Sequence, residues 1–150
     1  MKYLSLLVVL LLLSCKTNNS ISQNPCNTDY LYKLENADTL NDRKIFLFLK
    51  NYNNTECDNN AEYCQWRNEL LFLLLANHTN QFLSQLDRIP DKAKILDELA
   101  SPVHDGIDIT SVLDKVKTYD KYPETKQEVI TALNTAMQKY KRTVRNTRFF

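Results

Sequence analysis

The fold is decided by residues 61–77, AEYCQWRNELLFLLLAN. Apolar side chains recur there at helical spacing, and residues 70–76 are apolar on every side of the helix that this spacing predicts. Such a helix lies either at the centre of a domain or in a membrane, and seven apolar residues are far fewer than the ~20 needed to cross a bilayer. We therefore expect a central helix, with Glu62, Arg67 and Glu69 at its more exposed front positions.

Helical spacing continues on both sides of this stretch. Six further segments carry apolar residues at three- and four-residue intervals and are bounded by residues that cap or interrupt helices. They are residues 28–36, 40–51, 81–89, 92–100, 109–119 and 123–144. The expected N-caps are Asn27 or Thr28, Asp38 with Thr39, Thr79, and Asp108. The pattern predicts an all-α fold of about seven helices, either an irregular helical bundle or a short array of antiparallel helix pairs.

Composition supports a helical domain and excludes several functional classes. The chain has a single glycine, Gly106, so it cannot form the glycine-rich loops of P-loop and dinucleotide-binding proteins. Without Lys2, the remaining chain carries 18 Lys and Arg residues against 18 Asp and Glu residues. Because this balance is neutral, it gives no indication of nucleic-acid binding. We expect no nucleic acid among the partners and no cofactor.

Residues 1–15 have the features of an export signal. A lysine precedes the apolar run of residues 4–13, which has the length of a signal-peptide core and is too short to span a bilayer. The residues Leu12, Ser14 and Cys15 at its end resemble the lipobox of bacterial lipoproteins. This resemblance implies that the signal is cleaved before the cysteine, that the thiol receives a diacylglycerol, and that the new amino terminus is usually acylated, as with palmitate.

The resemblance and the composition together divide the chain into three parts. Residues 1–14 are the expected lipoprotein signal peptide, residues 15–26 a polar, lipidated tether, and residues 27–150 a single all-helical domain. Lys16, directly after the cysteine, resembles lipoproteins that are forwarded to an outer membrane. We therefore expect a protein held in the cell envelope by acylated Cys15, with the outer membrane favoured over the inner membrane.

Three cysteines remain once Cys15 is assigned to lipid, and an exported compartment permits disulfides. Cys57 and Cys64 would close a short loop at small entropic cost, so this pair is favoured. Cys26 with Cys57 is the alternative, and either pairing leaves one thiol over. No histidine lies at ligand spacing from these cysteines, so no metal site is expected.

The loop of residues 101–108 holds the residues closest to a catalytic grouping. His104, Asp105 and Asp108 could act as a base with carboxylates, or as metal ligands. A surface turn, with Asp108 as the cap of the next helix, accounts for every residue except His104. We favour the turn.

The basic end of the chain is a second candidate for function. From residue 124 onward, two acidic residues face six basic ones. Five of the bases follow one another closely: Lys139, Lys141, Arg142, Arg145 and Arg148. A basic terminal helix could lie on an anionic membrane surface or meet an acidic partner. A solvated helix end, whose cations suit the helix dipole, is the favoured alternative.

Together these patterns favour a binding protein. We expect a membrane-anchored exported lipoprotein that acts as a protein-binding or accessory module in the cell envelope, a class that includes immunity proteins and inhibitors. Two alternatives stay open at this point. One is an envelope enzyme that uses His104, Asp105 and Asp108, and the other is a purely structural component of the envelope.

Overall fold

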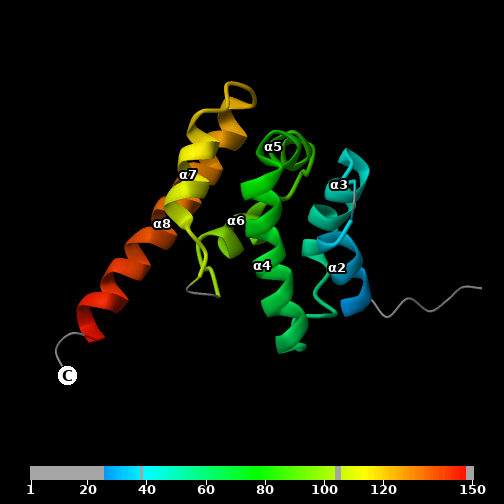
Figure 1. Ribbon diagram of the computed structural model, residues 1–150, viewed down its shortest axis with the longest axis horizontal. Helices are drawn as coiled ribbons and strands as arrows, with labels where there is room; N and C mark the ends of the chain where they lie inside the picture. The colour runs from blue at the N-terminus through cyan, green and yellow to red at the C-terminus, as the bar shows by residue number, and fades with distance from the viewer. Residues whose placement is uncertain (1–25, 38, 104–105, 148–150) are drawn as a thin grey trace, which may run out of the picture.

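The computed structural model describes residues 26–37, 39–103 and 106–147, and for residues 142–147 the backbone alone (Figure 1). Within these ranges the chain forms seven α-helices, one short 3-10 helix and no strand. The helices are α2 (Thr28–Glu35), α3 (Asp42–Lys50), η1 (Asn51–Asn53), α4 (Ala61–Asn77), α5 (Thr79–Asp87), α6 (Ala93–Leu99), α7 (Ile109–Lys117) and α8 (Pro123–Thr147). The predicted all-α fold of about seven helices is confirmed, and its arrangement is an irregular bundle.

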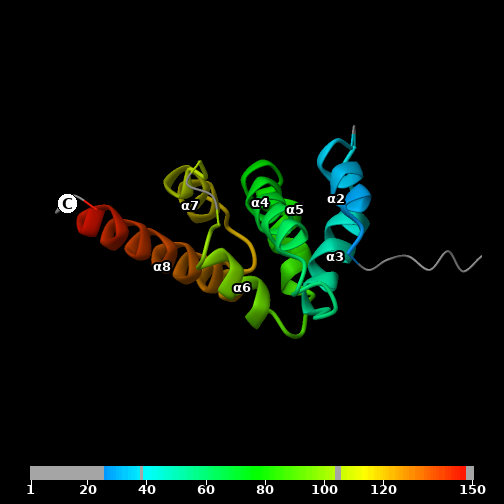
Figure 2. The same ribbon diagram turned by 90° about the horizontal axis from the view of Figure 1, so that it is seen from below.

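The helices follow one another across the molecule. Helices α2 and α3 lie at one end, α4 and α5 in the middle, and α7 and α8 at the other end (Figures 1 and 2). The contacts agree with this order, because α3 packs on α5, α2 on α4, and α8 on both α6 and α7. No helix of the described residues has the length and the apolar character needed to cross a membrane.

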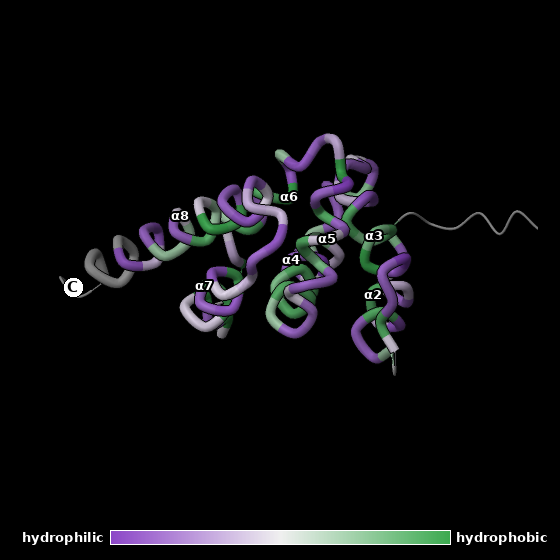
Figure 3. Tube along the Cα trace, turned by 90° about the horizontal axis from the view of Figure 1, so that it is seen from above, coloured by the Kyte–Doolittle hydropathy of each residue, from purple (hydrophilic) through white to green (hydrophobic). Residues whose placement is uncertain are grey.

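Helix α4 is the centre of the core. It contacts α2, α5, α6 and α7, and it lies between α7 and the α2–α3 end in Figure 3. Leu70, Leu71, Leu74 and Leu75 are all buried, whereas Leu73 is 40% exposed. The bounds and the central position of this helix are confirmed, because an all-round apolar segment can bury its side chains only when neighbours cover most of its faces.

Most helices begin at a side-chain cap. Two predicted caps are confirmed: Asn27 accepts a hydrogen bond from Asp29 N (2.8 Å), and Asp108 accepts one from Ser111 N (3.0 Å). Asn60, which was not predicted as a cap, begins α4 and accepts a hydrogen bond from Tyr63 N (3.0 Å). Each carboxylate or amide oxygen satisfies a backbone N–H that has no partner within the helix.

The N-cap of α3 differs from the prediction. Asn41, not Thr39, caps this helix and accepts a hydrogen bond from Lys44 N (3.0 Å), while Asp38 lies outside the described residues. Asn caps a helix as well as Asp does, and this Asn lies one turn before the first buried residue, Ile45.

Thr79 is the first residue of α5 and not its cap. Its hydroxyl donates a hydrogen bond to Leu75 O (2.7 Å) in the helix before it. His78 is both the C-cap of α4 and the N-cap of α5, so the two helices share one junction residue.

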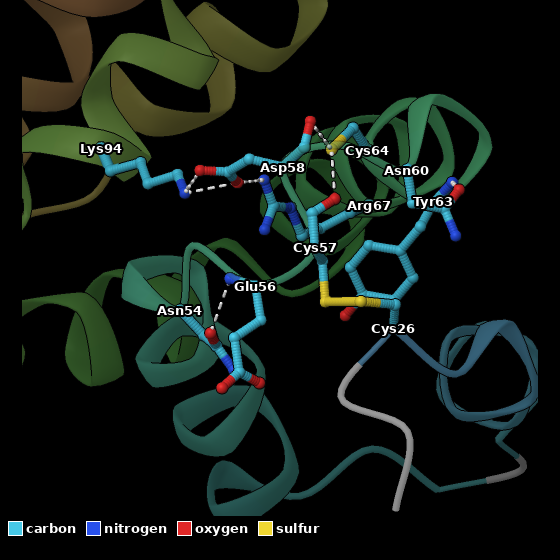
Figure 4. The surroundings of a disulfide bond; sticks show 10 residues. All are labelled: Cys26, Asn54, Glu56, Cys57, Asp58, Asn60, Tyr63, Cys64, Arg67 and Lys94. Carbon is cyan, nitrogen blue, oxygen red and sulfur yellow. Dashed lines mark hydrogen bonds and ion pairs between the residues drawn. A yellow bond between two sulfur atoms is a disulfide. The ribbon is translucent and has the colours of Figure 1, made fainter.

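The favoured disulfide, Cys57–Cys64, is wrong, because Cys57 is bonded to Cys26 (Figure 4). The two Cα atoms lie 5.3 Å apart, within the range that a disulfide requires. Cys64 lies in the first turn of α4 and its thiol donates to the carbonyl oxygen of Cys57 (3.3 Å). The side chain of Cys57 is buried and bonded to Cys26, which directly precedes α2. The pairing therefore follows the directions in which the cysteine side chains leave the backbone, and not the lower entropic cost of the shorter loop between Cys57 and Cys64.

Candidate functional site

A buried arginine lies at the front end of α4. Arg67 was expected at an exposed position, but it is 3% exposed. Its Nη2 lies 3.7 Å from Asp58 Oδ1, a contact seen in Figure 4, and 3.7 Å from Glu98 Oε1. Its guanidinium carbon lies 4.5 Å from the ring centroid of Tyr52. The guanidinium is thus held between two carboxylates and an aromatic face, an arrangement that suits its planar, always-charged group.

Tyr52, which lies in η1, packs its ring against the guanidinium of Arg67. Its hydroxyl donates a hydrogen bond to Arg67 O (2.7 Å), and its ring is fully buried. Burial raises the pKa of Tyr52 well above its ordinary value, and the nearby Glu98 adds to the effect. The phenol therefore stays neutral and keeps donating its hydrogen bond throughout the physiological range.

Polar contacts join the arginine site to α6. The side chain of Asn68 is buried, donates to Glu98 Oε2 (2.7 Å) and accepts from Val103 N (3.1 Å). Lys94 donates to both carboxylate oxygens of Asp58 (2.7 and 2.9 Å), and this contact is the main reason why the pKa of Asp58 lies below its usual value. Among the described residues, Arg67 Nε is the one buried side-chain polar atom without a hydrogen-bond partner. Because the other groups of the cluster pair with one another, we assign it a structural role that ties α4 to α6 and to the loop before α4.

An open groove lies between α6 and α8. Its volume is about 770 Å³. Its apolar floor consists of Leu96, Ala100 and Ala132. Gln127, Thr131 and Thr135 are exposed along its α8 side. Because these α8 residues are short or flexible, the backbone of another helix or strand could approach α8 closely here.

The rim of this groove is acidic. Asp97, Glu124 and Glu128 line it, and no lysine or arginine is among its lining residues. Glu128 Oε2 lies 3.1 Å from Lys92 Nζ, which is not itself among the residues that line the groove. We refer to this feature, with its apolar floor and three carboxylates, as the α6–α8 groove. It can accommodate a segment that presents both apolar and cationic side chains.

The α6–α8 groove is positioned by polar contacts at the start of α8. Thr125 is fully buried and donates a hydrogen bond to Asp87 Oδ1 (2.7 Å) of α5. Lys92 in turn donates to Thr125 Oγ1 (2.8 Å). Tyr122, the residue before α8, takes a positive φ of 53°, which turns the chain so that Pro123 can begin the helix.

Only part of the sequence-derived candidate residues falls in the described ranges. Cys15, His104, Asp105 and Arg148 lie outside them. Asp108 is described, and its carboxylate accepts the capping hydrogen bond from Ser111 N. The structure therefore gives Asp108 the turn role that was favoured for it. Among the described residues, no group of His, Cys, Asp and Glu is arranged to hold a metal ion.

The basic residues of α8 lie beyond the groove. Lys139 donates a hydrogen bond to Ser101 Oγ (2.7 Å), just after α6. Lys141 is exposed, and Arg142 and Arg145 lie in the last two turns of α8. The end of α8 extends past α7 and α6 in both views (Figures 1 and 2).

Neither the arginine site nor the α6–α8 groove was found from the sequence. The groove could have been noticed from acids and small residues that recur every three or four positions in α8, at Glu124, Glu128, Thr131 and Thr135. No local pattern could identify the arginine site, because Arg67 occupies a polar position of an otherwise regular helix.

Comparison of the chain with models of protein families, with curated proteins and with solved structures found no match in any of the three.

Proposed function

We propose that the protein is an exported lipoprotein, anchored in the cell envelope through Cys15, which binds a protein partner in the α6–α8 groove. The observation that carries the binding part is the groove itself, with its apolar floor and three carboxylates. The anchor part rests on the residues Leu12, Ser14 and Cys15, which resemble a lipobox. Lys16 favours the outer membrane.

The shape of the groove supports a macromolecular partner. Small-molecule sites are enclosed clefts that bury most of the ligand, whereas this groove lies open along two helices. An open groove with an apolar floor and a charged rim is typical of surfaces that bind a helix or an extended segment of another protein.

The position of the groove is compatible with a protein that is attached to a membrane and binds a partner at the same time. The tether would join the domain at Cys26, next to α2, and α8 lies at the opposite end of the bundle (Figures 1 and 2). A partner in the groove would therefore bind at the end of the domain that lies away from the point of attachment.

The lipid anchor is tested by replacing Cys15 with alanine. We expect this variant to lose all incorporation of a clickable fatty acid and to leave the membrane fraction or accumulate as the unprocessed precursor, because no other residue of the lipobox can accept the diacylglycerol. Labelling and fractionation of cells that express the full chain measure both effects. Equal labelling of wild type and C15A would overturn the anchor.

The groove is tested by photo-crosslinking in intact cells. A photoreactive amino acid at Gln127, in the groove, is expected to give a discrete crosslinked product. Gln65, which is exposed on α4 and does not line the groove, is the matched control and should give at least about fivefold less product, because residues outside an interface seldom lie within crosslinking distance of a partner. Equal yields from both positions, or none from Gln127, would contradict binding in the groove.

A further inference from the structure

The charges of α8 are separated along its length. Glu124 and Glu128 are its two acidic residues, and both lie in its first two turns. From Val129 to the end of the chain there is no acid, and five basic residues follow from Lys139 onward. Helix α8 is therefore acidic where it lines the α6–α8 groove and basic from Lys139 onward, and Lys139 itself bonds to Ser101 just after α6.

The acidic and the basic parts share one face of the helix. Glu124, Glu128, Thr131 and Thr135 succeed one another at intervals of three or four residues, as neighbours on one helix face do, and all of them line the groove. The next step of the same interval reaches Lys139. One row of α8 thus begins with carboxylates, continues with small hydroxyl residues and ends with an ammonium group.

A row with this order is complementary to itself when a second copy is laid antiparallel. The acidic and basic positions are arranged about a common centre. Position 133 is the midpoint between Glu124 and Arg142, and the midpoint between Glu128 and Lys139 falls within one residue of position 133. A twofold axis that passes beside position 133 places Glu128 opposite the partner's Lys139. By the same symmetry it places Lys139 opposite the partner's Glu128. Twofold interfaces of this kind, in which one patch meets itself, are the commonest in soluble oligomers.

We infer that the protein bound in the α6–α8 groove is a second copy of this chain, which lays the basic end of its own α8 antiparallel along the groove. This inference rests on the proposed function, because it names the occupant of the same groove. Thr131, Ala132 and Thr135 at the centre are small enough to let two helices approach to about 8–10 Å between their axes. The extension of α8 past α6 and α7 supplies the length of helix that reaches the partner's groove (Figure 2).

Membrane attachment strengthens such a pairing. Two lipid-anchored copies share one surface, so each experiences the other at a raised effective concentration. Contacts that would be weak in solution then suffice to hold the pair.

The inference is tested by reversing charges and restoring them. The full-length chain, with the photoreactive residue at Gln127, is expected to give a crosslinked product with twice the mass of one copy. This product should contain two copies of the chain and no other protein. Glu128→Lys and Lys139→Glu should each lower its yield about tenfold, because each places like charges opposite one another at two symmetric positions. The double variant E128K/K139E should restore at least half of the yield.

Two controls separate pairing from damage to the fold. Glu62→Lys reverses an exposed acid of α4 outside the groove and should leave the yield unchanged. Glu128 also pairs with Lys92 in the same copy, and the double variant still places lysine beside Lys92, so its recovery can come only from the contact between copies.

Each other outcome overturns the inference in a distinguishable way. A Gln127 product that contains a different protein would overturn self-association and leave binding in the groove intact. A self-product that both single variants leave unchanged would overturn the antiparallel pairing. The absence of any product from Gln127 would overturn both the inference and the proposed function.

Discussion

Replacing Arg67 with methionine is expected to lower the free energy of unfolding by about 3 kcal/mol, at the lower end of the values measured when one partner of a buried ion pair is removed. The side chain is almost fully buried, lies between Asp58 and Glu98, and stacks on Tyr52. Methionine fills a similar volume but leaves the Glu98 carboxylate beside Asn68 without its cation. The loss stays near the lower end because Lys94 still neutralises Asp58, which is half exposed.

Urea denaturation of wild type and variant, followed by circular dichroism, measures this loss. Arg43→Met is the matched control, because Arg43 is exposed in the first turn of α3, and we expect a change below about 0.5 kcal/mol there, as for surface substitutions in general. Equal stabilities of R67M and R43M would contradict the structural role assigned to the arginine site.

Replacing Cys26 with serine is expected to lower the free energy of unfolding by about 3–4 kcal/mol. Cys26 and Cys57 are 31 residues apart in sequence, and closing a loop of that length removes about this much chain entropy from the unfolded state in the standard loop-closure treatment. The covalent bond also fixes the start of α2 to the loop before α4. The same denaturation experiment, without reductant, measures the effect.

Cys64→Ser separates this pairing from the one that the sequence favoured. Its thiol makes only weak hydrogen bonds, to Cys57 O and Asp58 O, so serine should change the stability by less than about 1 kcal/mol. Alkylation of the unreduced protein should label Cys64 and leave Cys26 and Cys57 unlabelled. A large loss in C64S together with a small loss in C26S would show that Cys57 is bonded to Cys64 instead.

The helices could be predicted from the sequence because their signals are local. The apolar run of α4 and its cap, Asn60, lie within one stretch of chain, and so do Asp108 and the first turn of α7. Capping and helical spacing depend on residues three or four positions apart, which the sequence displays directly. The start of α3 was misplaced because two good capping residues, Thr39 and Asn41, lie in the same turn.

The sequence displays the row of acids and small residues on α8, but it could not locate the sites, because each is formed by contacts that the chain makes only after folding. Arg67 is buried because Asp58 in the preceding loop and Glu98, 31 residues further on, both come to it. Cys57 forms its disulfide with Cys26, while Cys64, in the first turn of α4, reaches only the backbone carbonyl oxygen of Cys57. The α6–α8 groove forms where two helices pack against each other. The spacing of apolar residues in the sequence shows that each helix is amphipathic, but it does not show how the two helices meet.

The disulfide also determines how the domain would bear mechanical load from the proposed anchor. Tension from such an anchor would reach Cys26 and pass through the covalent bond to Cys57, four residues before α4 begins. Residues 27–56, which include α2, α3 and η1, lie on the bypassed branch of the chain and carry none of that tension. A pull between the membrane and a partner held at α8 would therefore be transmitted through α4, the most deeply packed helix, while the first two helices remain mechanically unloaded.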